Sequence, residues 1–413
     1  MLSNYLKMAW KVLGRRKFFT FISLFGIGFT LTALMVVVAM VDHQLAPSYP
    51  ETQLDRILTV KRMRMHGDRS NWYAGPGFKF LDRYARDLPG VELMSIYTRP
   101  SETSSFLEGR KLVFQSRFAD AAYWRVLHFA FLEGAPFTDA DDRDANRVAV
   151  ITDSARRRFF GDEPALGKSV ELDGLEFRVV GVVRDVPAFR DISHAEIWMP
   201  LGTQTAAGFH ESLIGGCLAA YLLAPDTEKK QVQAAFQERL TRVAFDDPER
   251  FHTMKGMPMT KLENLANEML NLDPGETAPR RLILFAILAV LAFMALPAIN
   301  LININLSRIY ERSGEIGVRK AFGAASPDLV LQFVIENVVL CLLGGLIGLV
   351  GAFVLLYIAV QFPQVPLLTF HLNWRIFLAA LALAIVFGLL SGVGPAWKMS
   401  RQHPVNALKG GAS

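Results

Sequence analysis

The sequence combines long apolar stretches with a large polar segment. It has 413 residues, of which 51% are hydrophobic and 20% are charged, whereas soluble domains carry about 25% charged residues. This balance excludes a disordered chain and argues against an ordinary soluble enzyme. The 44 basic and 39 acidic residues nevertheless require a sizeable region in water. The net charge of +5 fits contact with nucleic acid or with a membrane surface, so the position of the basic residues must decide between them.

Four apolar stretches are long enough to cross a bilayer, which takes about 20 residues in a helix. The predicted transmembrane helices 1 to 4 are Phe18–Val41, Leu282–Leu306, Leu329–Phe362 and Trp374–Ala396. The first contains 24 residues without a charge, whereas the apolar region of a signal peptide has about 7–15 residues. We therefore interpret it as an uncleaved anchor, with a cleaved signal peptide as the alternative.

Basic residues flank these stretches unevenly. The segment 1–17 contains five, the loop Ser307–Asp328 contains four and the tail 397–413 contains three, whereas Gln361–Asn373 contains none. Basic residues are enriched in cytoplasmic loops, so both termini and the loop are predicted to be cytoplasmic. The basic excess then reflects membrane topology and predicts no nucleic-acid partner. The segment Asp42–Arg281 is then expected on the opposite, extracytoplasmic side of the membrane.

The segment Asp42–Arg281 is predicted to be a mixed α/β domain inserted between helices 1 and 2. Asp173–Gly174 joins two alternating stretches, Val170–Leu172 and Leu175–Val183, and therefore predicts a tight hairpin. Asp153–Phe160 is a predicted helix that Asp153 or Ser154 caps and Gly161 ends. Further predicted strands are Ile57–Val60, Lys111–Phe118, Arg147–Ile151 and Leu218–Leu223, and further predicted helices are Phe78–Leu88 and Glu228–Val243.

The sequence shows no recognisable catalytic or metal-binding pattern. Its histidines lack metal-site spacing, and it has neither a nucleophile elbow nor a phosphate-binding P-loop. The acids Asp139, Asp141, Asp142 and Asp144 lack the glycine and glutamate of a calcium loop, so we interpret them as a solvated loop. No catalytic residue, metal or cofactor is predicted in this chain.

The loop after helix 2 and the residues that follow it form the most informative segment. The sequence predicts a short charged helix, a break at Gly323 and a new helix whose first residue is Pro327. Two interpretations stay open from the residues alone. The segment is either a solvated connector or a helix that docks onto a cytoplasmic partner.

This loop resembles the signature of the FtsX-like, MacB-type ABC transporter permease family. The matching residues are Glu311, Arg312, Glu315, Ile316, Gly317, Val318, Arg319, Lys320, Ala321, Gly323 and Ala324. The periplasmic segment Phe131–Phe137 is also similar to that family, as is Pro395–Ala396 in the tail, although Asn406 replaces the usual glutamate. The resemblance implies that the signature residues couple the chain to an ATPase on a separate chain.

The resemblance further implies an assembly and a mechanism. Two ATPase subunits would bind ATP and Mg²⁺, and a second permease protomer would complete a homo- or heterodimer in the membrane lipids. The permease would transmit motion to its periplasmic domain and export a peptide, an antibiotic or a lipid-linked molecule, with a periplasmic adaptor and an outer-membrane channel as possible partners. The alternatives are an FtsX-like regulator of a periplasmic enzyme such as a cell-wall hydrolase, and a membrane-anchored periplasmic enzyme.

Small residues in two predicted helices have the spacing of close helix packing. They are Gly26 and Thr30 in helix 1 and Gly344 and Gly348 in helix 3. Packing within one chain and packing across a dimer both explain this pattern. The family resemblance favours Gly26 and Thr30 as the dimer contact.

Overall fold

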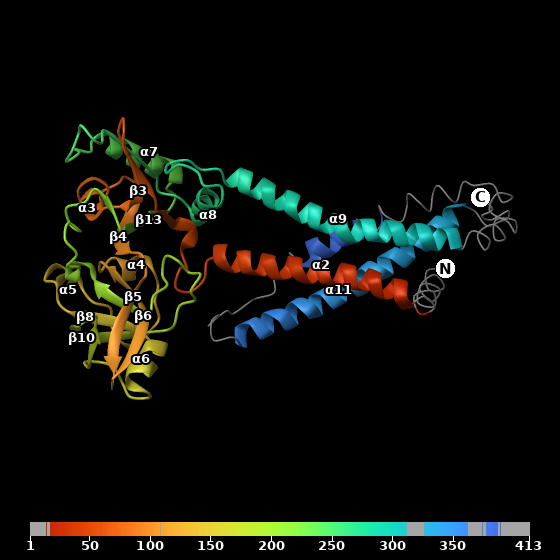
Figure 1. Cartoon of the computed structure of the whole chain (residues 1–413), viewed down its shortest axis with the longest axis horizontal. Coiled ribbons are helices and arrows are strands. Elements are labelled where there is room, and N and C mark those ends of the chain that lie inside the picture. The colour runs from red at the N-terminus through yellow and green to blue at the C-terminus, as the bar shows by residue number, and fades with distance from the viewer. Residues whose placement is uncertain are drawn as a thin grey trace. The chain divides into compact units, whose positions relative to one another are not determined.

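The computed structural model describes residues 14, 17–107, 109–311, 326–361, 374, 377–386 and 389. The chain divides into two compact units (Figure 1). One unit comprises Gln44–Ile283 together with a short later segment, and we call it the α/β unit. The other contains nearly all of the long apolar helices, and we call it the helical unit.

The helical unit is built from α2 (Lys17–Leu45), α9 (Pro279–Glu311) and α11 (Ser326–Gln361). Among the described residues, three helical stretches are long and apolar enough to cross a membrane: Lys17–Leu45, Pro279–Leu296 and Val334–Ala359. They overlap the predicted helices 1, 2 and 3. Predicted helix 4 lies only partly within the described residues, where Phe377–Val386 forms a shorter apolar helix. The number of four transmembrane helices therefore stays a prediction.

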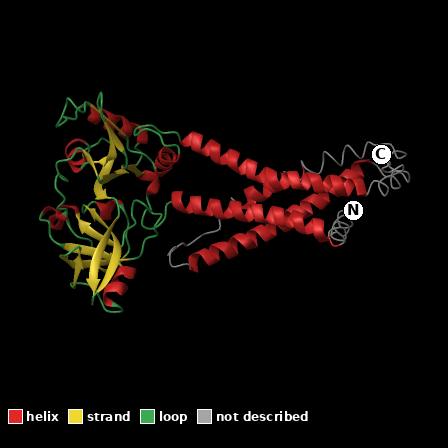
Figure 2. Cartoon of the chain, viewed as in Figure 1, coloured by secondary structure: helices red, strands yellow, loops and turns green. Residues whose placement is uncertain are grey.

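A mixed ten-stranded sheet forms the centre of the α/β unit (Figure 2). Its main path runs β1-β13-β4-β6-β11-β8-β10-β7, with β5 paired to β6 and β9 paired to β10. The parallel pairs are β10 with β8 and β11 with β6. The strands of this sheet are β1 Ile57–Val60, β4 Val91–Thr98, β5 Ser101–Leu107, β6 Arg110–Ala119, β7 Phe131–Gly134, β8 Val148–Thr152, β9 Ser169–Leu172, β10 Leu175–Val183, β11 Ile197–Pro200 and β13 Cys217–Leu223.

A second, four-stranded sheet has the order β12-β3-β2-β14. Its strands are β2 Met63–His66, β3 Asn71–Pro76, β12 Ile214–Gly215 and β14 Thr253–Gly256. The helices of the unit are α3 Phe78–Tyr84, α4 Tyr123–Val126, α5 Asp139–Arg143, α6 Asp153–Phe160, α7 Lys229–Thr241 and α8 Lys261–Met269. Phe80 of α3 and Phe236 of α7 are fully buried in one core with Tyr221 of the large sheet. The apolar faces of these helices therefore attach the small sheet to the large one.

The predicted hairpin is confirmed. Leu175 pairs with Leu172, and both turn residues have a positive φ, 48° at Asp173 and 79° at Gly174. A primed turn needs this conformation at both central positions, and Asp-Gly adopts it readily. The predicted strands lie within one residue of β1, β6, β8 and β13. The helix predicted at Phe78–Leu88 ends earlier, at Tyr84.

Two local predictions are wrong. Helix α6 has the predicted bounds, but its N-cap is Thr152, whose Oγ1 accepts a hydrogen bond from Ala155 N at 3.2 Å. Asp153 instead pairs with two arginines of its own helix. The acidic segment predicted as a loop contains the short helix α5, which begins with a capping box between Thr138 and Asp141. In both helices the N-cap is a threonine that precedes the first acidic residue, so the prediction placed the cap of α6 at least one position too late and missed α5 altogether.

Candidate functional site

The residues predicted to couple to an ATPase lie at the edge of the described chain. Glu311 is the last residue of α9. Arg312, Glu315, Ile316, Gly317, Arg319, Lys320 and Gly323 lie outside the described residues. Their role stays a prediction from the sequence.

Two of the predicted small residues, Gly344 and Gly348 of α11, lie against α2 in the helical unit. A Cβ atom built on Gly344 would lie 2.6 Å from Ile27 Cγ2, and one built on Gly348 would lie 2.7 Å from Leu31 Cβ. Both glycines therefore permit a close approach within one chain. Thr30 is buried and donates to Gly26 O at 2.8 Å within its own helix. A role of these residues in a dimer stays a prediction.

A cluster of charged side chains joins the two ends of the α/β unit. Glu51, shortly after α2 ends at Leu45, is completely buried. It accepts hydrogen bonds from Lys261 Nζ at 3.0 Å and from Arg190 Nη1 at 3.3 Å. Lys261 is the first residue of α8, the last helix before α9. The segment that leaves one apolar helix is thus bonded to the segment that leads into another.

We call this cluster the ionic junction, and it comprises Glu51, Lys61, Arg190, Asp191, Lys261 and Glu268. Asp191 is half-buried, pairs with Lys61 and lies 3.7 Å from Lys261. Glu268 of α8 lies 3.9 Å from Lys61. Three cations therefore face three anions. Burial raises the pKa of Asp191, but Lys61 and Lys261 outweigh it and hold that pKa below its ordinary value.

The loop between β10 and β11 completes the junction. Arg190, which is fully buried, donates to Ala46 O at 2.9 Å as well as to Glu51. Ser193 Oγ donates to Glu51 Oε1 at 2.9 Å. Arg117 of β6 is also fully buried and donates to Asp191 O at 3.1 Å and to His194 O at 2.5 Å. Charge-assisted hydrogen bonds of this kind are short and directional, so they fix the loop against both the large sheet and the segment after α2.

Sequence reasoning missed this junction. Its hydrogen-bonded members Glu51 and Lys261 are 210 positions apart, and no member belongs to a motif with a fixed spacing. A buried charge also looks like a surface charge in a single sequence. Only the fold brings Glu51 and Lys261 together, through the antiparallel bridge between Thr59 and Met259 that places α8 beside β1.

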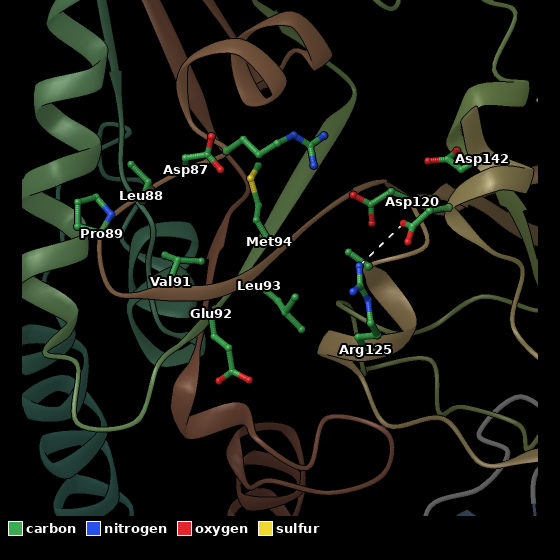
Figure 3. Close-up of a pocket in the computed structure, with 13 residues that line it drawn as sticks. Asp87, Leu88, Pro89, Val91, Glu92, Leu93, Met94, Asp120, Arg125 and Asp142 are labelled. Carbon is green, nitrogen blue, oxygen red and sulfur yellow. Dashed lines mark ion pairs between the residues drawn. The ribbon is translucent and has the colours of Figure 1, made fainter. Parts of the chain in front are cut away.

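A separate cleft of about 630 Å³ lies between the end of α3, strand β4 and helices α4 and α5 (Figure 3). Arg125 is one of its lining residues and lies 3.9 Å from Asp139. Asp120 is buried in its wall and accepts from Ser95 Oγ at 2.8 Å and from Ile96 N at 2.9 Å. Burial outweighs these hydrogen bonds and raises the pKa of Asp120 to about 6. Asp120 also accepts a hydrogen bond from Tyr123 N of α4 at 3.1 Å, so it connects β4 to α4.

The described residues contain no group of three or more His, Cys, Asp or Glu side chains that could hold a metal ion. The chemistry visible in the α/β unit is thus that of ion pairs, hydrogen bonds and packed helices. Such an arrangement can bind a partner or a ligand and can carry a displacement from one segment to another.

Comparison with known proteins identifies both parts of the chain. Residues 20–239 match the MacB-like periplasmic core domain, and residues 285–404 match the FtsX-like permease C-terminal domain. The chain is 26% identical over 423 residues to the macrolide export ATP-binding/permease protein MacB of Burkholderia cenocepacia, covering 97% of this chain and 57% of that protein. It is 24% identical over 423 residues to the protein of the same name of Escherichia coli K12, covering 98% and 60%.

The chain thus spans less than two thirds of the length of these curated relatives. Among solved structures, it is similar to a domain of a putative permease from Porphyromonas gingivalis, with 21% identity and a TM-score of 0.39 over 55% of this chain and 100% of that one. It is also similar to the periplasmic region of MacB from Actinobacillus actinomycetemcomitans, with 16% identity and a TM-score of 0.37 over 52% and 92%. The first domain match alone spans more than half of the chain. The chain therefore belongs to the MacB-like, FtsX-type family of ABC transporter permeases.

Proposed function

We propose that this chain is the permease subunit of an ABC transporter that passes motion driven by ATP hydrolysis into its periplasmic domain. The ATPase would be a partner chain present in two copies, binding ATP and Mg²⁺, and a second permease protomer would complete the dimer. The family supports this role, and the relatives carry the words ATP-binding/permease in their names. Export of a peptide, an antibiotic or a lipid-linked molecule, with help from a periplasmic adaptor and an outer-membrane channel, belongs to the same proposal.

The ionic junction is the observation that carries the mechanism. Glu51 and Lys261 stand on the two segments that connect the α/β unit to α2 and α9. If an ATPase shifts these helices, the two connections must move together for the domain to move as a body. A buried pair with short hydrogen bonds resists sliding, because its donors and acceptors lose their partners when displaced. The ionic junction thus supports movement of the α/β unit as one body, rather than separate movement of its two connecting segments.

The input to this movement is proposed to be the cytoplasmic loop. The basic residues of Ser307–Asp328 and of both termini support a cytoplasmic position for these segments. The loop carries a charged signature with Glu315 at its centre. If Glu315 is buried when the loop docks, a substitution that reverses its charge should cost about 2–5 kcal/mol of binding free energy. A loss of that size weakens the complex by roughly 30-fold or more.

The test is recovery of an ATPase with the tagged full-length chain from its native membranes. Wild type should retain a chain with nucleotide-binding motifs and Mg²⁺-dependent ATP hydrolysis, whereas Glu315→Arg should lose both by about 30-fold. Glu171→Arg, on an exposed strand position of the α/β unit, is the matched charge reversal and should behave as wild type. Equal recovery from wild type and Glu315→Arg, at equal expression, would refute the docking role.

A further inference from the structure

A second cavity of the α/β unit, of about 420 Å³, has the composition of a ligand site rather than of a packing defect. Binding pockets are typically apolar and aromatic with a few polar groups at the edge. This cavity is lined by the apolar side chains Met65, Trp72, Leu213, Ile214, Phe245 and Phe251. Glu211, Asp246 and Asp247 are the charged residues of its lining. We call it the aromatic pocket.

The walls of the aromatic pocket come from three separate parts of the chain. Strands β2 and β3 supply Met65 and Trp72, the segment that leads into β12 supplies Leu213, and the segment after α7 supplies Phe245 and Phe251. Trp72 is 49% exposed, which is unusual for the largest apolar side chain. Its ring centre lies 6.5 Å from that of Phe251. The half-exposed Trp72 ring, next to the buried Phe251 ring, can therefore contact a ligand in the pocket.

The charged residues that line the aromatic pocket are all acidic, and two basic side chains lie against this lining. Lys79 Nζ pairs with Asp246 at 2.5 Å, which neutralises one of the three carboxylates. Asp247 accepts a hydrogen bond from Arg250 N, and the Arg250 guanidinium lies 5.1 Å from the Phe251 ring centre. No basic side chain stands among the lining residues. Because Asp246 is paired with Lys79 and Phe251 faces Arg250, the negative character left to the pocket comes from Glu211, Asp247 and the half-exposed Trp72 ring.

From these features we infer that the aromatic pocket binds an organic ammonium ion with an apolar body. Aromatic faces attract cations, most strongly tryptophan, and quaternary ammonium groups are held by several rings together. Carboxylates at the edge favour the same charge, while the apolar walls favour aryl or alkyl substituents over a bare inorganic cation. The inference goes beyond the proposed function, because equilibrium binding in this pocket requires no ATPase.

The test is a saturation-transfer NMR titration of the full-length chain in lipid nanodiscs without nucleotide. The probe is benzyltrimethylammonium, and phenylmethanesulfonate is the counterpart with the same aryl group and the opposite charge. We expect saturable binding of the cation with a Kd on the order of 1 mM for a ligand of this size. The anion should show no saturable binding.

Variants then assign the site. Trp72→Leu keeps an apolar side chain but removes the indole face, and it should weaken cation binding about 3- to 30-fold. Glu211→Gln combined with Asp247→Asn should weaken it about 3- to 10-fold. The matched controls are Phe106→Ala, an aromatic side chain that is 60% exposed on β5, and Glu171→Gln on β9, and both should bind as wild type.

Three results would overturn the inference: equal binding of the anion, unchanged affinity in the pocket variants, or no saturation about 20-fold above the expected Kd. Each is separable from the ATPase test. Loss of the ATPase in Glu315→Arg leaves cation binding unaltered, and loss of cation binding in Trp72→Leu leaves ATPase recovery unaltered.

Discussion

Replacing Glu51 with Gln removes the anion on which three segments of the α/β unit converge. Glu51 is completely buried and accepts from Lys261 Nζ, Arg190 Nη1 and Ser193 Oγ at 3.0, 3.3 and 2.9 Å. Gln has nearly the same volume and keeps one acceptor oxygen, but its amide hydrogens then face donors. Removing one member of a buried ion pair typically costs about 3–5 kcal/mol, because the partner charge stays buried. We expect a loss in this range.

Thermal unfolding of the full-length chain in detergent, followed by near-ultraviolet circular dichroism, measures this loss. For folded regions of roughly 150–250 residues, 1 kcal/mol shifts Tm by about 2–4 °C, so Tm should fall by about 6–20 °C. The control is Glu238→Gln, which breaks an exposed pair with Arg242 one turn away and should shift Tm by less than about 2 °C. A Glu51→Gln variant that unfolds within about 2 °C of wild type would refute the reasoning.

Three further predictions concern pH, packing and topology. The pKa of Asp120 is raised to about 6 because the folded chain favours its protonated, neutral form. The resulting contribution to the free energy of unfolding is complete below about pH 4 and is lost as pH rises through about 6. Raising pH from 5 to 8 should therefore cost about 1.4 kcal/mol in denaturant unfolding, and a wild-type profile matching that of Asp120→Asn would contradict this. Gly348→Leu places a side chain where a Cβ already lies 2.7 Å from α2, so Tm should fall by about 2–10 °C, whereas Gly14→Leu, with open space around it, should leave Tm unchanged. A reporter active only in the periplasm should work when fused after Glu171 and fail at Gly323, and the reverse pattern would overturn the orientation.

Local chemistry explains which parts of the fold were predictable from the sequence. Asp173–Gly174 fixes its hairpin because the two residues tolerate the positive φ that a primed turn needs. The helix Asp153–Phe160 ends where predicted because Gly161 takes φ 61°. The apolar stretches at Lys17–Leu45 and Val334–Ala359 are equally local signals, since length and hydropathy define them. Each of these features depends on residues close together in the chain.

The features that were missed depend on contacts between distant residues. Nothing near Glu51 in the sequence distinguishes it from the surface carboxylates, and its partners lie 139 and 210 positions away. The aromatic pocket is equally invisible, because Trp72 and Phe251 become neighbours only when β2 pairs with both β3 and β14. The glycines were recognised from their spacing, but the helix that they contact was not specified. The composition and the spacing of apolar residues identify which surfaces of a helix or strand must be buried. The topology of the fold decides which other elements bury them.

The chemistry of the ionic junction is itself an argument about mechanism. Buried ion pairs are seldom the most stabilising choice, since well-packed apolar residues of similar volume often hold a fold equally well. What this cluster adds is a defined geometry: Lys261, Arg190 and Ser193 all donate to Glu51, and a large displacement would leave these buried groups without partners. An apolar contact between the same segments would instead tolerate sliding, because the hydrophobic effect has no direction. Under the proposed function, in which the domain moves through two connections, the first property matters more than the second, and Glu51 lies where the two connecting segments are bonded together.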